Sequence, residues 1–201
     1  MKEYQFTNDW FGVARNMWPT LVPHLPDNKS FLEIGSWEGR ATVWIAENMA
    51  ADQDAMITCI DTWQGGEEHN KDEMGGVFSR FNANMNALAD NQHERGKNIL
   101  VRAIRNTSVQ GLAELIHEGR EFDFIYIDGS HIAKDVLIDA CMSWPMLKSG
   151  GVMVFDDYMW RGSPMLLHRP KPAVDAFTSI FGQDLVVMHN GYQVAIQKVA
   201  R

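Results

Sequence analysis

The chain has 201 residues, enough for one domain with a full hydrophobic core and little more. Hydrophobic residues make up 45% of it, as in soluble globular proteins. The formal net charge of -8 argues against broad binding to nucleic acid or to an acidic membrane, because neutralising phosphates requires clustered Lys and Arg.

We expect neither a targeting signal nor a disulfide framework. The sequence starts without the apolar segment of a secretion signal, and no apolar run approaches the roughly 20 residues of a membrane span. Cys59 falls in a predicted strand and Cys141 in a predicted helix, each within an apolar stretch. We therefore expect two buried thiols and a cytoplasmic protein.

Residues 1–29 are predicted to form an N-terminal extension that is helical around Trp10–Trp18 and ends at a run of prolines. Three roles suit this segment: packing against the domain, a flap over the substrate, or a contact between subunits of a homo-oligomer. The expected apolar stripe consists of Phe6, Trp10, Phe11, Val13, Ala14 and Met17.

The rest of the chain, residues 30–201, is predicted to be one α/β domain. A strand over Ser30–Ile34 is followed by Gly35-Ser36-Trp37-Glu38-Gly39 and by a helix from about Arg40 to Met49. Glycines let a ligand approach the backbone, and a helix N-terminus offers free N–H groups. This arrangement is typical of nucleotide-binding sites, although a purely structural turn gives the same pattern.

A second strand, Ala55–Ile60, ends in Asp61. A carboxylate at this position commonly binds a ribose diol, and the alternative is a helix N-cap. The segment 62–76 that follows is polar and rich in glycine, which predicts a surface loop near the strand ends. Closure over a substrate and simple connection both remain open for this loop.

Strands and helices continue to alternate and end in a hairpin at Asn190-Gly191. Ser108 is the predicted N-cap of one helix, and a polar group at this third strand end is also placed to contact a bound base. The predicted elements are a helix over 77–94, a strand over 98–104, a helix over 109–118, a strand over 122–127, a helix over 132–147, a strand over 151–155, a short helix over 171–181, and strands over 185–188 and 192–198.

Acidic residues follow two of these apolar strands. Asp128 comes directly after one, and Asp156 and Asp157 come after the next, with His131 nearby. Parallel strands place their carboxyl ends at one edge of the sheet, so these four side chains are expected to converge. Three carboxylates with an imidazole are typical of a hard cation beside a base. Mg²⁺ is the expected ion, and Mn²⁺ or Ca²⁺ suits the same oxygens.

Each of these residues also has a simpler role. Asp128 is suited to cap a helix, although Ser130 competes for that position, and His131 is suited to the exposed first turn of a helix. Adjacent carboxylates at Asp156 and Asp157 repel each other, and a cation would relieve that repulsion. The aromatic residues expected either to line the pocket or to be partly buried are Trp63, Tyr158 and Trp160.

These motifs resemble those of the class I S-adenosylmethionine-dependent methyltransferases over about residues 30–199. The resemblance is carried by the segment from Glu33 to Gly39, by Asp61 and by the terminal hairpin. It implies a Rossmann-like, seven-stranded, mostly parallel sheet with an antiparallel C-terminal hairpin and helices on both faces. The expected cofactor contacts are Glu33, Gly35, Ser36, Trp37, Gly39, Asp61, Thr62, Trp63, Ser108 and Asp128.

Within that fold, Asp128-Gly129-Ser130-His131 together with Asp156-Asp157 resembles the metal-dependent O-methyltransferases, above all those that methylate sugar hydroxyls of macrolide antibiotics. The resemblance implies that the three aspartates hold Mg²⁺ and that His131 is the base. Catechol-type relatives carry Lys and Asn at the positions of His131 and Asp157. The chain is short for the macrolide group and lacks its large N-terminal region.

The expected function is therefore Mg²⁺-assisted methyl transfer from S-adenosylmethionine to a hydroxyl of a small molecule, with His131 and Asp128 in catalysis. Sugars, phenols and other hydroxylated metabolites all suit the site, and methylation at nitrogen is an alternative. An NAD-dependent oxidoreductase is the rival enzyme, although the first turn lacks G-x-G-x-x-G and the end hairpin is unusual for that class. A module that binds S-adenosylmethionine without turnover is the third possibility.

Overall fold

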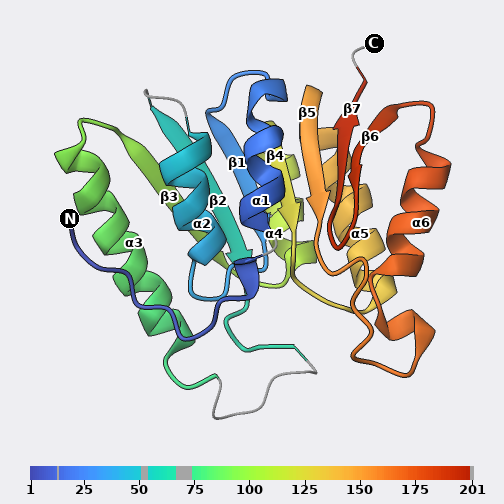
Figure 1. The fold of residues 1–201 in the computed structure, drawn as a ribbon, viewed down its shortest axis with the longest axis horizontal. Coiled ribbons are helices and arrows are strands. Elements are labelled where there is room, and N and C mark those ends of the chain that lie inside the picture. The colour runs from blue at the N-terminus through green and yellow to red at the C-terminus, as the bar shows by residue number, and fades with distance from the viewer. Residues whose placement is uncertain (13, 51–53, 67–73, 200–201) are drawn as a thin grey trace.

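The computed structural model describes residues 1–12, 14–50, 54–66 and 74–199, arranged around a seven-stranded sheet (Figure 1). The strands are β1 (Ser30–Ile34), β2 (Ala55–Asp61), β3 (Ile99–Arg105), β4 (Phe122–Ile127), β5 (Leu147–Phe155), β6 (Leu185–Asn190) and β7 (Val194–Lys198). Their order is β3-β2-β1-β4-β5-β7-β6. β1 to β5 pair in parallel, and β7 lies antiparallel between β5 and β6. The predicted sheet, with its inserted last strand, is confirmed.

Helices cover both faces of this sheet, as predicted (Figure 1). The α-helices are α1 (Ala14–Met17), α2 (Arg40–Trp44), α3 (Val77–Glu94), α4 (Ser108–His117), α5 (Ala133–Ser143) and α6 (Lys171–Ile180). A π-helical stretch, Ile45–Met49, continues α2, and short 3-10 turns are Trp10–Gly12, Trp18–Thr20, Val22–His24, Trp144–Met146 and Leu166–His168.

Two hydrophobic cores lie on opposite faces of the sheet, because successive side chains of a strand point to opposite sides. In β4, Phe124 and Tyr126 pack with α2, α3 and the N-terminal segment, whereas Ile125 and Ile127 pack with α4, α5 and α6. Every residue of β4 is buried. The central strand β4 is thus covered on both faces, and only its carboxyl end is open to solvent.

The N-terminal segment is less regular than predicted. Instead of one helix around Trp10–Trp18, it forms short helical pieces, and Pro19 and Pro23 lie in the first turns of two of them. Trp18 is fully buried against Phe124 and Tyr126 and contributes to the core shared with the sheet. The division of the chain at residue 29 stays a prediction, and Val13 lies outside the described residues.

The prediction for the cysteines is half correct. Cys59 is buried in β2, but Cys141 is exposed on α5. The segment around Cys141 is apolar on nearly every side, so its composition does not reveal which face meets the sheet. Val136 and Ala140 take the buried face, and Ile138 is exposed with Cys141. Within the described ranges, no helix is both long and apolar enough to cross a membrane.

Candidate active site

A cavity of about 1600 Å³ opens at the carboxyl ends of β1, β2, β4 and β5. Its walls come from the turn after β1, from Asp61, from the start of α4, and from the segments that follow β4 and β5. The N-terminal segment adds a further wall with Phe6, Asn8 and Trp10. The cavity thus lies at the sheet edge where the strand-end residues were expected to meet.

Gly35 allows the turn after β1 to lie directly against the end of β4. Its φ is +86°, and a Cβ built on it would lie 2.1 Å from the carbonyl oxygen of Asp128. The Asp128 N–H donates to the Ile34 carbonyl at 2.8 Å, and the Gly35 N–H donates to the Ile60 carbonyl at 2.9 Å. Any side chain at position 35 would separate these segments, so the glycine shapes the cavity floor.

Asp61 fastens the same turn. Its Oδ2 accepts the backbone N–H groups of Ser36 and Trp37 at 2.8 and 2.9 Å, and its Oδ1 accepts that of Trp63 at 2.7 Å. These contacts hold Trp37 in a conformation with a φ of +48°. Asp61 lines the cavity, and its predicted contact with a ribose stays a prediction.

Glu33 lines the cavity and supports the turn after β1. Its side chain is only 1% exposed and accepts a hydrogen bond from the Thr42 hydroxyl of α2. Burial, together with the charge of nearby Asp61, raises the pKa of this carboxyl to about 8. Glu33 therefore joins β1 to α2, and its contact with a cofactor stays a prediction.

The Tyr126 hydroxyl lies between two of the predicted metal ligands. It is hydrogen-bonded to Asp156 and lies 2.9 Å from Asp128 Oδ2. Desolvation by the surrounding cavity walls, followed by repulsion from Asp156 and Asp157, raises the pKa of Asp128 well above its usual range. Burial and then the charge of Asp157 raise the pKa of Asp156. The cluster therefore favours a proton or a cation among its carboxyl groups.

Asp157 forms a pair with His131 at the cavity wall. Asp157 Oδ2 lies 2.7 Å from His131 Nε2, and Asp157 Oδ1 accepts a hydrogen bond from the Tyr192 hydroxyl at 2.9 Å. The Trp160 ring lies 4.3 Å from the imidazole, centroid to centroid. Asp157 has a φ of +56°, a conformation that turns its side chain away from the direction a regular strand would give.

The donor set suits Mg²⁺ chemically, because it consists of carboxylate oxygens that repel one another. The geometry is different: among the residues that the structure describes, no group of three or more His, Cys, Asp or Glu side chains is arranged to hold a metal ion. The oxygens of Asp156 and Asp157 point instead to Tyr126, Gln193, Tyr192 and His131. The metal site stays a prediction.

The segment around His131 differs from the prediction. α5 begins at Ala133, one residue after the predicted start at 132, and ends at Ser143 before a 3-10 turn, so His131 lies in the preceding loop and not in the first turn of a helix, the simpler role considered for it. The Ser130 hydroxyl accepts from the Ile132 N–H at 3.1 Å and donates to Asp135 at 3.0 Å. This local serine turn competes with the helix and delays its start.

The cap of α4 is also shifted by one residue. Thr107, not Ser108, is the N-cap, and its hydroxyl accepts from the Gln110 N–H at 3.4 Å. Both residues line the cavity. Ser108 occupies the first helical position beside the strand end, and its contact with a base stays a prediction.

The other predicted site residues are divided between the cavity and the core. Ser36, Trp37, Thr62 and Trp160 are among the residues that line the cavity, whereas Gly39, Trp63 and Tyr158 are not. The side chain of Trp63 is 5% exposed and packs on the α3 residues Phe78 and Phe81. Residues 67–73, in the middle of the predicted loop over 62–76, lie outside the described residues.

Several polar residues of the site were missed. Tyr126 is hidden in an apolar run, although its position two residues before Asp128 places both side chains on one face of β4. Gln193 donates to Asp156 Oδ2 at 2.8 Å from a distant hairpin, and no local pattern marks it. Asp139 lines the cavity at 1% exposure, and burial raises its pKa to about 7. The sequence signal for Asp139 was its position as an acidic residue within the apolar face of α5.

A family model described as a methyltransferase domain matches residues 32–158, well over half of the chain. The chain belongs to this methyltransferase-domain family. The S-adenosylmethionine-dependent methyltransferase class indicated by the motifs is thus confirmed, and the NAD-dependent alternative loses its support. No curated protein sequence matches this methyltransferase.

Solved structures show the same methyltransferase fold. An O-methyltransferase from Bacillus cereus, in complex with SAH, is 16% identical over 96% of this chain and 84% of that chain, with a TM-score of 0.59. The O-methyltransferase NovP is 16% identical over 92% of this chain and 79% of that chain, with a TM-score of 0.59. A third structure is MycE from the mycinamycin biosynthetic pathway, in complex with Mg, SAH and mycinamycin VI. It is 15% identical over 98% of this chain and 50% of that chain, with a TM-score of 0.58.

Proposed function

We propose that this methyltransferase transfers the methyl group of S-adenosylmethionine to a hydroxyl oxygen of a small molecule, with His131 as general base and a divalent cation at the aspartate cluster. The observation that carries the proposal is the pairing of His131 with Asp157 in the same cavity as the glycine turn. A cofactor site and a proton acceptor that share one cavity are the two parts that such a transfer needs.

Asp157 suits His131 to this task. A neutral imidazole that directs its Nε2–H to a carboxylate carries its lone pair on Nδ1, and the carboxylate stabilises the charged ring once a second proton arrives. Nδ1 is buried in this arrangement, so the acceptor reaches it when the imidazole turns or the Trp160 ring moves aside. Bound S-adenosylmethionine would supply the methyl group and keep the carbon–sulfur electron pair on its sulfur as the acceptor oxygen takes the methyl, and His131 would receive the proton of the acceptor hydroxyl.

The charge of the aspartate cluster supports the cation. Asp128 and Asp156 line the cavity together, Asp128 exposed to it and Asp156 half-buried, and repulsion between carboxylates contributes to the raised pKa of each. A bound cation would neutralise these groups and lower the pKa of an acceptor hydroxyl. Holding it requires the Asp156 and Asp157 oxygens to give up some of their present partners, Tyr126, Gln193, Tyr192 and His131.

A hydroxylated small molecule is the acceptor that the cavity suits best. Drug-sized ligands usually occupy about 300–1,000 Å³, so a cavity of about 1600 Å³ has room for cofactor and acceptor together. Trp160 and Tyr192 line it beside His131 and offer aromatic surface to a sugar or phenolic ring. MycE, which shares the fold, is described in complex with a macrolide, Mg and SAH.

The metal is tested by thermal unfolding with S-adenosylhomocysteine, in Mg²⁺ and in EDTA. We expect Mg²⁺ to raise the midpoint of the wild type and to have no effect on Asp156→Ala, whereas both proteins keep the response to S-adenosylhomocysteine. Asp175→Ala, which removes an acid bonded to Lys171 on α6, is the matched control and should keep the Mg²⁺ response. An undiminished Mg²⁺ response in Asp156→Ala removes this aspartate from the metal site.

The base is tested by turnover, measured as S-adenosylhomocysteine released in a screen of sugar and phenolic acceptors. His131→Ala should lower turnover by about 100-fold or more, because general bases contribute that much, while cofactor affinity stays unchanged. His93→Ala, on the exposed end of α3, is the control. Wild-type turnover in His131→Ala would take His131 out of the mechanism.

A further inference from the structure

The first residues of the chain run beside α3 (Figure 1), and we call residues 2–11 the strap. They are held chiefly through backbone groups. Asn91 accepts from the Lys2 N–H at 2.6 Å and donates to the Lys2 carbonyl at 2.9 Å. Asn84 accepts from the Gln5 N–H at 2.6 Å and donates to the Gln5 carbonyl at 2.9 Å. Each asparagine side chain thus makes the two backbone hydrogen bonds that a neighbouring strand would make in a sheet.

The spacing of these contacts fits an extended segment. Asn84 and Asn91 lie two turns apart on one side of α3, which corresponds to about 10.5 Å along the helix axis. Lys2 and Gln5 are three residues apart, which corresponds to about 10 Å in an extended chain. Both asparagines are almost fully buried, so each needs its backbone partners. The face of α3 is therefore matched to the strap.

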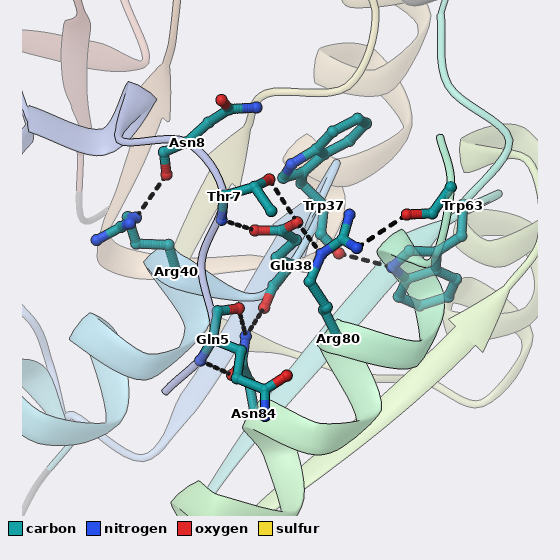
Figure 2. Close-up of polar contacts among 10 residues, drawn as sticks. Gln5, Thr7, Asn8, Trp37, Glu38, Arg40, Trp63, Arg80 and Asn84 are labelled. Carbon is teal, nitrogen blue, oxygen red and sulfur yellow. Dashed lines mark hydrogen bonds and ion pairs between the residues drawn. The ribbon is translucent and has the colours of Figure 1, made fainter. Parts of the chain in front are cut away.

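Glu38 joins the strap to the glycine turn. It is 1% exposed, and its carboxylate accepts the Thr7 N–H and the Thr7 hydroxyl, both at 2.7 Å, and the Arg80 guanidinium at 2.5 Å. Asn84 donates to the Glu38 carbonyl at 2.8 Å. Figure 2 shows Thr7 and Arg80 reaching the carboxylate from opposite sides, with Asn84 between Gln5 and the Glu38 backbone.

The far end of the strap forms part of the cavity wall. Phe6, Asn8 and Trp10 line the cavity, and the Asn8 carbonyl accepts from Arg40, the first residue of α2, at 3.0 Å. The Trp10 ring lies 5.2 Å from the ring of Trp37 in the glycine turn and is 59% exposed. The strap therefore closes one side of the space beside the cofactor-binding turn without belonging to the sheet.

We propose that Glu38 is a positioning residue for the cofactor: by holding Thr7 it keeps the strap closed as a wall of the cavity, and release of this contact opens the path by which the cofactor leaves. This inference rests on the proposed use of S-adenosylmethionine. When the contact with Thr7 breaks, Glu38 still pairs with Arg80. Opening of the strap therefore leaves the buried carboxylate with a cation beside it. Cofactor binding and strap closure then stabilise each other.

The test is hydrogen exchange of the peptide 1–11 with and without S-adenosylhomocysteine, together with the dissociation rate of that ligand. In the wild type, the ligand should slow exchange of this peptide at least tenfold. Glu38→Gln and Thr7→Val should exchange faster and release the ligand at least tenfold faster. Thr20→Val removes a hydroxyl that lies beyond the strap in the N-terminal region and bonds to the Met17 carbonyl, away from Glu38, and it should behave as the wild type.

The outcomes separate this inference from the proposed function. If the wild type does not bind S-adenosylhomocysteine, both are wrong. If it binds the ligand but exchange of peptide 1–11 does not change, the strap inference alone is wrong. Should Glu38→Gln fail to fold, Thr7→Val decides, because it keeps the buried pair of Glu38 and Arg80. A dissociation rate equal to that of the wild type then overturns the role of the Glu38–Thr7 contact.

Discussion

Two buried carboxyl groups, those of Glu33 and Glu38, belong to residues that line the cavity, and each is buried for a separate local reason. Glu33 meets Thr42 of α2, and Glu38 meets Thr7 and Arg80. A carboxylate out of water is costly unless donors or a cation compensate it. Glu38 has a cation and Glu33 has none among the contacts described, which is why burial raises the pKa of Glu33 to about 8.

The pKa of Glu33 predicts a pH dependence of stability. Its value of about 8 lies above the ordinary 4.5, so the folded state binds a proton that the unfolded state has lost between these pH values. Stability therefore falls as pH rises through this window and levels off above it. Glu33→Gln keeps an acceptor for Thr42 but cannot ionise, so relative to the wild type it should gain up to about 1.4 kcal/mol per pH unit.

Urea unfolding of both proteins at about pH 5 and about pH 8 checks this expectation. The gap between the variant and the wild type should widen in favour of Glu33→Gln at the higher pH. Glu121→Gln, at an exposed position before β4, is the control and should show no such change. A gap that is the same at both pH values would mean that Glu33 does not titrate in this window.

At the scale of elements, the turn between β1 and α2 depends on its contact with the end of β4. Gly35 meets the Asp128 backbone so closely that the two segments form one surface. Asp61 at the end of β2 then fixes the N–H groups of Ser36 and Trp37. Three neighbouring strand ends thus cooperate to shape the site, and a disturbance of the turn reaches the aspartate cluster through Asp128.

Gly35→Ala should therefore damage both stability and binding. The new Cβ would overlap the Asp128 carbonyl oxygen, and a φ of +86° is unfavourable for alanine, so we expect a loss of at least about 2 kcal/mol in the free energy of unfolding. S-adenosylhomocysteine should no longer bind. The control is Gly12→Ala, where a Cβ meets nothing within 4 Å. Binding by Gly35→Ala at wild-type affinity would show that the close contact is dispensable.

At the scale of the whole molecule, the parts set by local pattern were predictable and those set by tertiary contacts were not. Apolar runs, the glycine turn and Asn190-Gly191 defined the strands and their ends, so the sheet and its inserted strand followed. The direction of each aspartate side chain did not follow, because Tyr126 lies inside β4 and Gln193 in the turn between β6 and β7, both far from Asp156 in sequence. The strap was also hidden, since its partners lie on α3 and contact its backbone rather than its side chains.

The choice of cofactor can be tested directly on the whole chain. A cavity built on the ends of β1, β2, β4 and β5 and closed by the strap should bind a sulfur-containing nucleoside cofactor. Calorimetric titration of the full chain with S-adenosylhomocysteine, and separately with NAD, measures this. We predict saturable binding of S-adenosylhomocysteine that is lost in Gly35→Ala, and no heat of binding with NAD. Binding of NAD without binding of S-adenosylhomocysteine would contradict the account.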